Sequence, residues 1–268
     1  MIEIAFLGAG RMASAMIEGI LRQGKWPPGA LICTSAADGT GQALAKQTGI
    51  HYTDDPATLL DEAQTLVLAC KPQQLESIAP TLAELATNRL VLSILAGVPL
   101  QRLIALIPDV RNTVRAMPNT PGQIGAGISA FTAYRPLMVN DQAVVETILG
   151  ALGQVLALPE EQLDAVTALS GSGPAYVFEF VAALRDGGIA AGLPAETAYT
   201  LALQTTLGAA RLLAKRDESP EQLRDQVVSP GGTTEAGLSC LQERGLHAML
   251  ADTIQAAKQR SIALAASP

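Results

Sequence analysis

The chain has 268 residues, of which 49% are hydrophobic and 16% are charged. This length fits about two domains and is sufficient for a core without disulfide or metal support. The net charge of -7 argues against binding to a polyanion such as DNA, and an aromatic content of 3% argues against a base-stacking surface. We therefore expect no nucleic-acid partner.

Cysteine and histidine are scarce. Cys33, Cys70 and Cys240 lie far apart in the chain and are expected to be free thiols in a reducing compartment. Two histidines, His51 and His247, offer little material for a metal site or a catalytic triad, so we expect no metal. No apolar run reaches the roughly 18 residues that span a bilayer, and no signal peptide is visible. We expect a cytoplasmic protein with no membrane partner.

The first 160 residues alternate short apolar runs with helical patterns. Strands are expected at 2–7, 30–34, 65–70, 90–95 and 110–115, with a weaker one at 50–53, and helices at 11–23, 40–48, 73–86 and 99–106. Runs such as IEIAFL and TLVLAC are typical of strands covered on both faces of a parallel sheet. This alternation predicts an α/β domain over residues 1–160, a doubly wound Rossmann-like sheet.

From residue 161 to 268 the strand signals fade. Helical segments rich in Ala and Leu are expected at 174–191, 195–215, 219–228, 233–243 and 246–265. The segment AYVFEFVAAL, residues 175–184, carries a single charge at Glu179. Because a helix that is apolar nearly all round must be buried on more than one side, we expect an all-helical domain that dimerises.

A glycine-rich turn, FLGAGRMASAM, follows the first expected strand. Gly8, Gly10 and Ala13 fit the pattern G-x-G-x-x-G/A: the first permits a tight turn, the second lets a pyrophosphate approach, and the third keeps the helix close to its strand. A tight turn without a ligand is the alternative. The position between a strand and a helix favours dinucleotide binding.

The end of the second strand bears on the choice of cofactor. It offers the hydroxyls of Thr34 and Ser35, and no acid before Asp38. A carboxylate at the strand end would hold the 2′-hydroxyl of NAD and repel a 2′-phosphate, so NADPH is favoured. No arginine lies in this stretch, which leaves room for NADH. The alternative is that Thr34 and Ser35 only cap the following helix.

Five further segments carry a family resemblance. They are ACKP (69–72), SILAG (93–97), RAMPNTPG (115–122), SGSGPAY (170–176) and VVSPGGTTEAGLSCL (227–241). In this order and spacing the chain closely resembles the pyrroline-5-carboxylate reductases, over essentially its whole length. The resemblance implies a Rossmann domain and a helical domain that interlocks with a second subunit, in dimers that commonly assemble into a decamer. It also implies NADPH-dependent reduction of (S)-1-pyrroline-5-carboxylate to L-proline, the last step of proline biosynthesis.

The resemblance also places the cofactor. It implies contacts at the turn, at the end of the second strand, at the next two strand ends and at the connector: Leu7, Gly8, Ala9, Gly10, Arg11, Met12, Thr34, Ser35, Ala69, Cys70, Lys71, Pro72, Ile94, Leu95, Ala96 and Asn119. Lys71 is equally well explained as a solvated lysine at a strand end. Two positions depart from the pattern. Pro56 stands where many relatives have an Asn beside the adenine ribose, and Gln226 replaces an Asn of some relatives.

The chemistry needs neither a histidine nor a metal. A protonated cyclic imine accepts hydride once the protein has oriented both reactants, bound the substrate carboxylate and favoured the iminium form. Two segments open helices and are candidate anion cradles, with ordinary capping as the alternative. Their substrate-binding residues are Ser170, Gly171 and Ser172 in the first, and Gly231, Gly232, Thr233 and Thr234 in the second.

Thr234 is the candidate for a hydrogen bond to the imine nitrogen and for proton delivery. The residues alone do not separate it from Thr233, and the resemblance selects it. Two other functions stay open: reduction of a six-membered cyclic imine acid, since one ring methylene is worth only about 1–3 kcal/mol, and a non-catalytic nucleotide sensor. Retention of both substrate segments argues against the sensor.

Overall fold

The structure is a computed structural model that describes residues 2–265. The chain forms two compact units. The sheet unit contains residues 2–172 together with residues 257–265, and the helical unit contains residues 173–256. The boundary expected at residue 160 therefore differs from the division by packing. Leu163 and Ala168 are fully buried in the sheet unit and keep the intervening segment with it.

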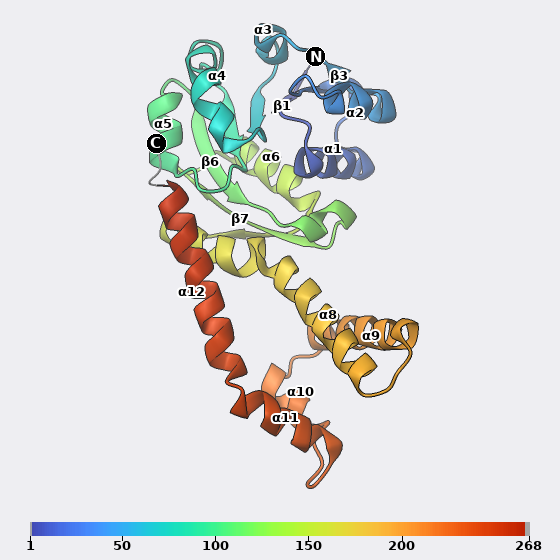
Figure 1. The fold of residues 1–268 in the computed structure, drawn as a ribbon. Coiled ribbons are helices and arrows are strands. Elements are labelled where there is room, and N and C mark those ends of the chain that lie inside the picture. Colours follow the sequence, from blue (N-terminus) through green and yellow to red (C-terminus); the bar gives the residue numbers. More distant parts are fainter. Residues whose placement is uncertain (1, 266–268) are drawn as a thin grey trace. The chain divides into compact units, whose positions relative to one another are not determined.

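An eight-stranded sheet forms the centre of the sheet unit (Figure 1). Its strands are β1 Ile4–Leu7, β2 Leu31–Thr34, β3 His51–Tyr52, β4 Thr65–Leu68, β5 Leu90–Ser93, β6 Asn112–Met117, β7 Gly127–Ala133 and β8 Gly153–Ala157, in the order β3-β2-β1-β4-β5-β6-β7-β8. Neighbouring strands are parallel except for β7, which runs antiparallel to β6. The first six strands have the order of a doubly wound dinucleotide fold, which confirms the predicted class.

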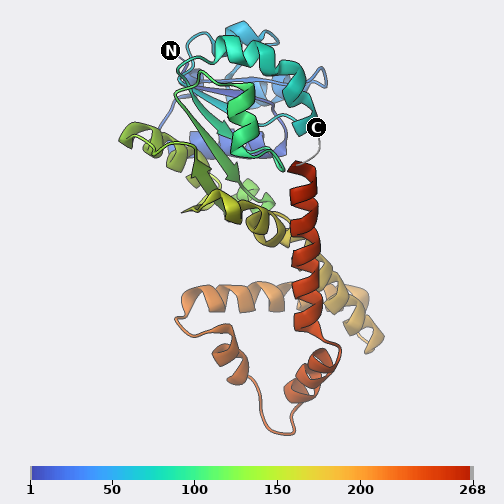
Figure 2. The ribbon, with the colours of Figure 1, turned by 90° about the vertical axis from the view of Figure 1, so that its left-hand side faces the viewer.

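Helices cover both faces of this sheet (Figure 2). The helices of the sheet unit's first 160 residues are α1 Arg11–Gln23, α2 Thr40–Thr48, α3 Pro56–Leu60, α4 Pro72–Leu85, α5 Leu100–Leu106 and α6 Val139–Gly150. One buried cluster joins α1, α2 and α6 to one face of the sheet, and a second joins α3, α4 and α5 to the other. Burial on both faces explains why β1, β4 and β5 read as continuous apolar runs.

Several elements differ from the sequence expectation. The strands β7 and β8 and the helices α3 and α6 were not predicted, and β6 begins at Asn112 rather than at 110. Val110 is buried among the side chains of the second cluster, so its apolar character reflects packing before the strand begins. The three short 3₁₀ segments are Pro28–Ala30, Thr120–Ile124 and Glu160–Gln162.

A buried arginine connects four segments of the sheet unit. The guanidinium of Arg115 lies 3.1 Å from a carboxylate oxygen of Glu160 and 3.5 Å from one of Asp164. The same Glu160 oxygen accepts from the amide of Leu100 at 2.7 Å, and Asp164 accepts from the hydroxyl of Ser261 at 2.8 Å. Because Ser261 lies in the last helix, this network holds the end of the chain against the sheet unit.

The helical unit is built from α8 Gly173–Ala190, α9 Ala195–Lys215, α10 Pro220–Asp225, α11 Thr233–Glu243 and most of α12 Leu246–Ala265. These bounds agree closely with the predicted helices. The helices α8 and α9 pack closely, and a Cβ added at Gly188 would lie 3.2 Å from that of Ala198. Their outer faces are apolar and open: Phe178 on α8 is 67% exposed and Leu201 on α9 is 52% exposed in the single chain.

Candidate functional site

The glycine turn lies at the carboxyl end of β1, beside β4, where the strand order reverses. Gly8 has φ +116°, and a Cβ built there would lie 2.5 Å from the backbone oxygen of Ala69. Its amide donates to the carbonyl of Thr34 at 3.1 Å. Only glycine fits this position, because both the backbone angle and the neighbouring strand end exclude a side chain.

The helix that follows offers a phosphate site. Gly10 is the N-cap of α1, no side chain caps this end, and Ser14 makes the first helical bond to the Gly10 carbonyl at 2.9 Å. A Cβ added at Gly10 would meet no atom within 4 Å. Open space beside uncapped first-turn amides fits the pyrophosphate of a dinucleotide, so the residues present suit the cofactor that the turn predicts.

A cleft of about 270 Å³ continues from this turn across the carboxyl edge of the sheet. It brings together five residues that the sequence predicted for the cofactor, namely Leu7, Gly8, Thr34, Ser35 and Cys70. Pro56, one of the two departures, also lines it, as the first residue of α3. The other residues that line the cleft were not predicted from the sequence: Ala36, Asp54, Gln74, Ser77 and Ile78. Their signal was position, since each follows a strand of the carboxyl edge within a few residues or lies in the first turns of α4.

The segment after β2 is tied to the start of α2. The Ser35 hydroxyl accepts from the amide of Gly41 at 3.0 Å and donates to the carbonyl of Ala36 at 2.9 Å. The Asp38 carboxylate accepts from the amide of Thr40 at 3.0 Å and from its hydroxyl at 2.7 Å. The Thr40 bonds lower the pKa of Asp38, so this carboxylate is charged at neutral pH. The Ser35 hydroxyl is therefore bonded to an amide in the first turn of α2, and the negative charge of Asp38 lies three residues beyond it.

The remaining predicted cofactor residues are spread around this cleft. Ala9, Gly10 and Arg11 line a neighbouring groove of about 580 Å³ against α2, and Pro72 and Ala96 line a hollow of about 350 Å³. Three of them pack partly against the first core cluster, namely Met12, Ala69 and Ile94, and Leu95 is buried in the second. Lys71 is exposed at the start of α4, and Asn119 lies in the connector after β6. The Leu95 side chain is therefore packed inside the sheet unit and is not available to a ligand at this edge.

The first predicted substrate segment does not start a helix from a loop. Helical geometry already begins at α7, Leu163–Val166, and passes through a π-helical turn, Thr167–Gly171, before α8. The amide of Ser172 donates to the carbonyl of Thr167 at 2.9 Å. Ser170 and Gly171 are thus the end of a π-turn, a feature that often occurs at functional sites. The segment expected to open the long helix therefore continues a helical path that begins earlier, at Leu163.

The second predicted segment does open a helix from a tight turn. Ser229, Pro230, Gly231 and Gly232 form a turn in which the Gly232 amide donates to the Ser229 carbonyl at 2.9 Å. Gly231 has φ +70°, as the third position of a Pro-Gly turn requires. The Gly231 amide donates to the Glu235 carboxylate at 2.7 Å.

The helix after this turn has an uncapped start. Gly232 is the N-cap of α11, and no side chain bonds to the first-turn amides. Thr233 is exposed and Thr234 is half-buried. The first-turn amides of α11, beside Thr233 and Thr234, are therefore free to donate to an anion such as a carboxylate.

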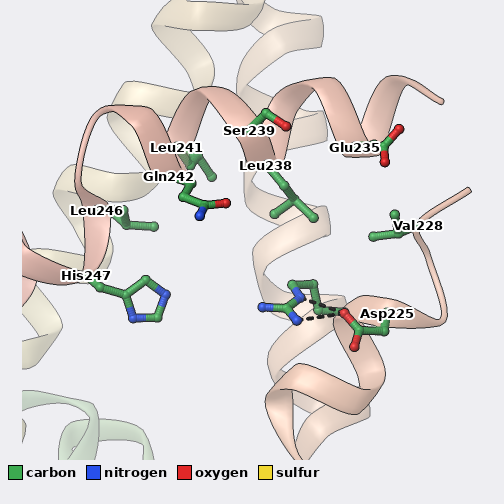
Figure 3. Close-up of a pocket in the computed structure, with 10 residues that line it drawn as sticks. Asp225, Val228, Glu235, Leu238, Ser239, Leu241, Gln242, Leu246 and His247 are labelled. Carbon is green, nitrogen blue, oxygen red and sulfur yellow. Dashed lines mark hydrogen bonds and ion pairs between the residues drawn. The ribbon is translucent and has the colours of Figure 1, made fainter. Parts of the chain in front are cut away.

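A separate cavity of about 670 Å³ lies within the helical unit (Figure 3). Leu238 and Gln242 on α11, His247 on α12 and Asp225 on α10 project into the space between these helices. Asp225 is bonded to the guanidinium of Arg224 at 2.7 Å and 2.9 Å. The lining does not include the residues predicted to bind the substrate.

Two negative findings concern residues 2–265. In this part of the chain, no three His, Cys, Asp or Glu side chains are grouped so that they could bind a metal ion. Over the same residues, none of the helices has the length and apolar character needed to cross a bilayer.

The fold and the turn define a dinucleotide-dependent oxidoreductase with a Rossmann-like cofactor domain. A family model described as NADP oxidoreductase, coenzyme F420-dependent, matches residues 3–97, and the model for pyrroline-5-carboxylate reductase dimerisation matches residues 160–264. The chain is 40% identical to the pyrroline-5-carboxylate reductase of Synechocystis sp. over 97% of both chains, and 40% identical to that of Pseudomonas aeruginosa over 98% of this chain and 97% of the relative. It belongs to the pyrroline-5-carboxylate reductase family.

Solved structures agree with this assignment. The pyrroline-5-carboxylate reductase of Coxiella burnetii superposes with a TM-score of 0.92 at 33% identity over 99% of both chains. The Plasmodium falciparum enzyme, solved with NADP bound, gives 0.88 at 29% identity over 99% of this chain and 98% of that one. Members of this family make proline from pyrroline-5-carboxylate with NAD(P)H, and this chain is an oxidoreductase of that kind.

Proposed function

We propose that NADPH binds along the carboxyl edge of the sheet, with its pyrophosphate at the uncapped start of α1 and its adenosine half in the cleft beside Thr34 and Ser35. The carrying observation is the turn at Gly8 and Gly10, where one glycine is enforced by the neighbouring strand and the other leaves open space. When bound, the reduced nicotinamide supplies a hydride. The preference over NADH is shallow, because Asp38 adds a negative charge near the expected 2′-phosphate.

The substrate is (S)-1-pyrroline-5-carboxylate, and its carboxylate is held at the uncapped start of α11. The amides after Gly232 and the positive end of the helix favour an anion there, with Gly231 and Thr233 as further contacts. Ser170, Gly171 and Ser172 are the substrate-binding residues that we propose in the sheet unit. The Thr234 hydroxyl bonds the imine nitrogen and relays a proton to it, taking up a proton from solvent as it gives its own, which makes the ring carbon a better hydride acceptor. No histidine or metal ligand is needed for these steps.

A kinetic comparison of two threonine variants tests this role. Thr234→Ala is expected to lower kcat/KM for the imine by about 100-fold or more, because it removes a hydroxyl that acts in the transition state, while the Kd for NADPH stays unchanged. The matched control is Thr253→Ala, which removes a hydroxyl bonded to a helical carbonyl elsewhere in the unit, at Met249. Proline is identified by chromatography. Equal rates for the two variants would remove Thr234 from the chemistry.

Assembly and location complete the proposal. Self-association is supported by the dimerisation match and by the exposed apolar faces of α8 and α9. We extend it to a decamer, which the mass in light scattering would test, with a dimer mass as the contrary result. The cytoplasmic location is supported by three unpaired thiols, one of them Cys33, whose pKa burial raises to about 11.

A further inference from the structure

A proline leaves one carbonyl of the substrate segment without its usual partner. In a helix the carbonyl of residue 170 would accept from the amide of residue 174. Residue 174 is Pro174, which has no N–H. The Ser170 hydroxyl does not relieve this, because it donates in the other direction, to the carbonyl of Val166 at 3.1 Å. The Ser170 carbonyl therefore lacks its α-helical donor and is open to a donor from another segment.

Asn119 is that donor. Its side-chain Nδ2 donates to the Ser170 carbonyl at 3.1 Å, across a separation of 51 residues. Its Oδ1 accepts from the amide of Ile128 at 2.9 Å, at the start of β7. The Asn119 side chain thus joins three segments: the connector after β6, the start of β7 and the π-turn.

The surroundings of this side chain are closely packed. A Cβ added at Gly127 would lie 2.9 Å from the Asn119 Oδ1 and 2.6 Å from the backbone nitrogen of Gly122. One added at Gly171 would lie 2.6 Å from the terminal carbon of Met117. Gly127 excludes a side chain because its nearest neighbours are backbone atoms, so the Asn119 amide is held on one side by the start of β7, while at Gly171 the π-turn contacts the flexible end of Met117. A rigid support of this kind can fix the position of the residues it carries.

We propose that Asn119 is a positioning residue: it holds the π-turn at Ser170 in the arrangement in which Ser170, Gly171 and Ser172 meet the substrate, and it does so by supplying the hydrogen bond that Pro174 withholds. This inference rests on the proposed function of that segment. It assigns Asn119 to the substrate side of the reaction, whereas the family resemblance had placed it beside the cofactor. Small displacements of positioning groups cost rate because the reactants must meet within tenths of an ångström.

The test is Asn119→Asp, which keeps an acceptor for the Ile128 amide and loses the donor to Ser170. The matched control is Asn112→Asp. Asn112 is the first residue of β6, the strand that Asn119 follows. Its Nδ2 donates to the carbonyl of Arg135 at 2.9 Å, and its Oδ1 accepts from the amide of Thr113, also at 2.9 Å. Both variants lose one amide-to-carbonyl bond between segments, but the control is outside the site.

Three readouts are taken on the purified full chain. For Asn119→Asp, kcat/KM for pyrroline-5-carboxylate falls about 10- to 100-fold while KM for NADPH changes less than about twofold. For Asn112→Asp, both constants stay at wild-type values even if Tm falls. Hydrogen exchange of the peptide covering 165–173 becomes faster in Asn119→Asp and stays unchanged in the control.

The outcomes separate the two proposals. An altered KM for NADPH with unchanged imine kinetics overturns the positioning role in favour of a cofactor contact. Unchanged exchange at 165–173 overturns it as well. If the wild-type chain makes no proline, the proposed function fails, and the exchange experiment still decides whether Asn119 holds the π-turn.

Discussion

Replacing Gly8 with alanine tests the geometry of the cofactor turn. The new Cβ would lie 2.5 Å from the Ala69 oxygen, 2.7 Å from its carbonyl carbon and 2.9 Å from the amide nitrogen of Cys70. All three are backbone atoms at the end of β4, so the neighbour has no flexible side chain that can turn away. The residue must in addition adopt φ near +116°, which L-residues rarely do.

Two costs add at this position. Overpacking costs about 1–3 kcal/mol, and strain at positive φ adds about 1–2 kcal/mol. The variant should therefore lose about 2–5 kcal/mol of its free energy of unfolding, and with a slope of about 2–4 °C per kcal/mol its Tm should fall by about 4–20 °C. This loss must appear without nucleotide, because the clash is with the protein itself.

Gly10→Ala is the comparison. Its Cβ meets no atom within 4 Å, and its φ of −72° suits any residue, so the cost without nucleotide is about 1 kcal/mol or less. It would nevertheless occupy the space expected for the pyrophosphate and weaken NADPH binding. Thermal unfolding by circular dichroism and fluorescence titration with NADPH measure the two effects. A Gly8→Ala protein as stable as wild type, or a Gly10→Ala protein with wild-type Kd, would refute the reasoning.

Three more outcomes are expected. Asp38→Asn should raise the ratio of kcat/KM with NADPH to kcat/KM with NADH by about fivefold at low salt, because it removes a charge near the 2′-phosphate, and by less at high salt. The control Asp109→Asn, which changes an exposed acid before β6, should leave this ratio unchanged. Arg115→Met removes the arginine partner of two partly exposed carboxylates and should lower Tm by about 5–10 °C in thermal unfolding. An unchanged Tm would mean that the network contributes nothing to stability. Phe178→Asp should abolish the dimer in light scattering, and a variant with wild-type mass would place α8 outside the interface.

The parts of the fold that follow from local pattern were predictable. Strands β1 to β6 are confirmed: burial on both faces gives β1, β4 and β5 a continuous apolar run, whereas the two-residue β3 and the polar residues of β6 carry a weaker signal. The glycine turn was also recognisable, since its residues carry the constraint locally. The strand β7 was missed for the opposite reason. Its sequence GISAFTA is made mostly of small residues, and its place depends on Gly127 packing against the backbone of Gly122.

The candidate site divides in the same way. The sequence brought Leu7, Thr34 and Ser35 to one edge because parallel strands end together. It did not show that Asn119 reaches Ser170, because that bond joins segments 51 residues apart through tertiary packing. The bond from the Gly41 amide to the Ser35 hydroxyl is local, and the capping alternative had allowed for it. The π-turn was equally hidden, since no local residue pattern distinguishes it from an ordinary first helical turn.

The end of α12 has a consequence for how the chain is made. The hydrogen bond from Ser261 to Asp164 closes a loop of 97 residues, and the length of this loop makes closure cost about 4 kcal/mol in chain entropy. A ribosome that adds about 5–20 residues per second delivers residues 173–256 over several seconds before Ser261 emerges. During that interval the nascent sheet unit lacks its final piece, whereas the helices of the other unit are all available to pack. Completion of the cofactor-binding half is thus timed by the last turns of the chain to be translated.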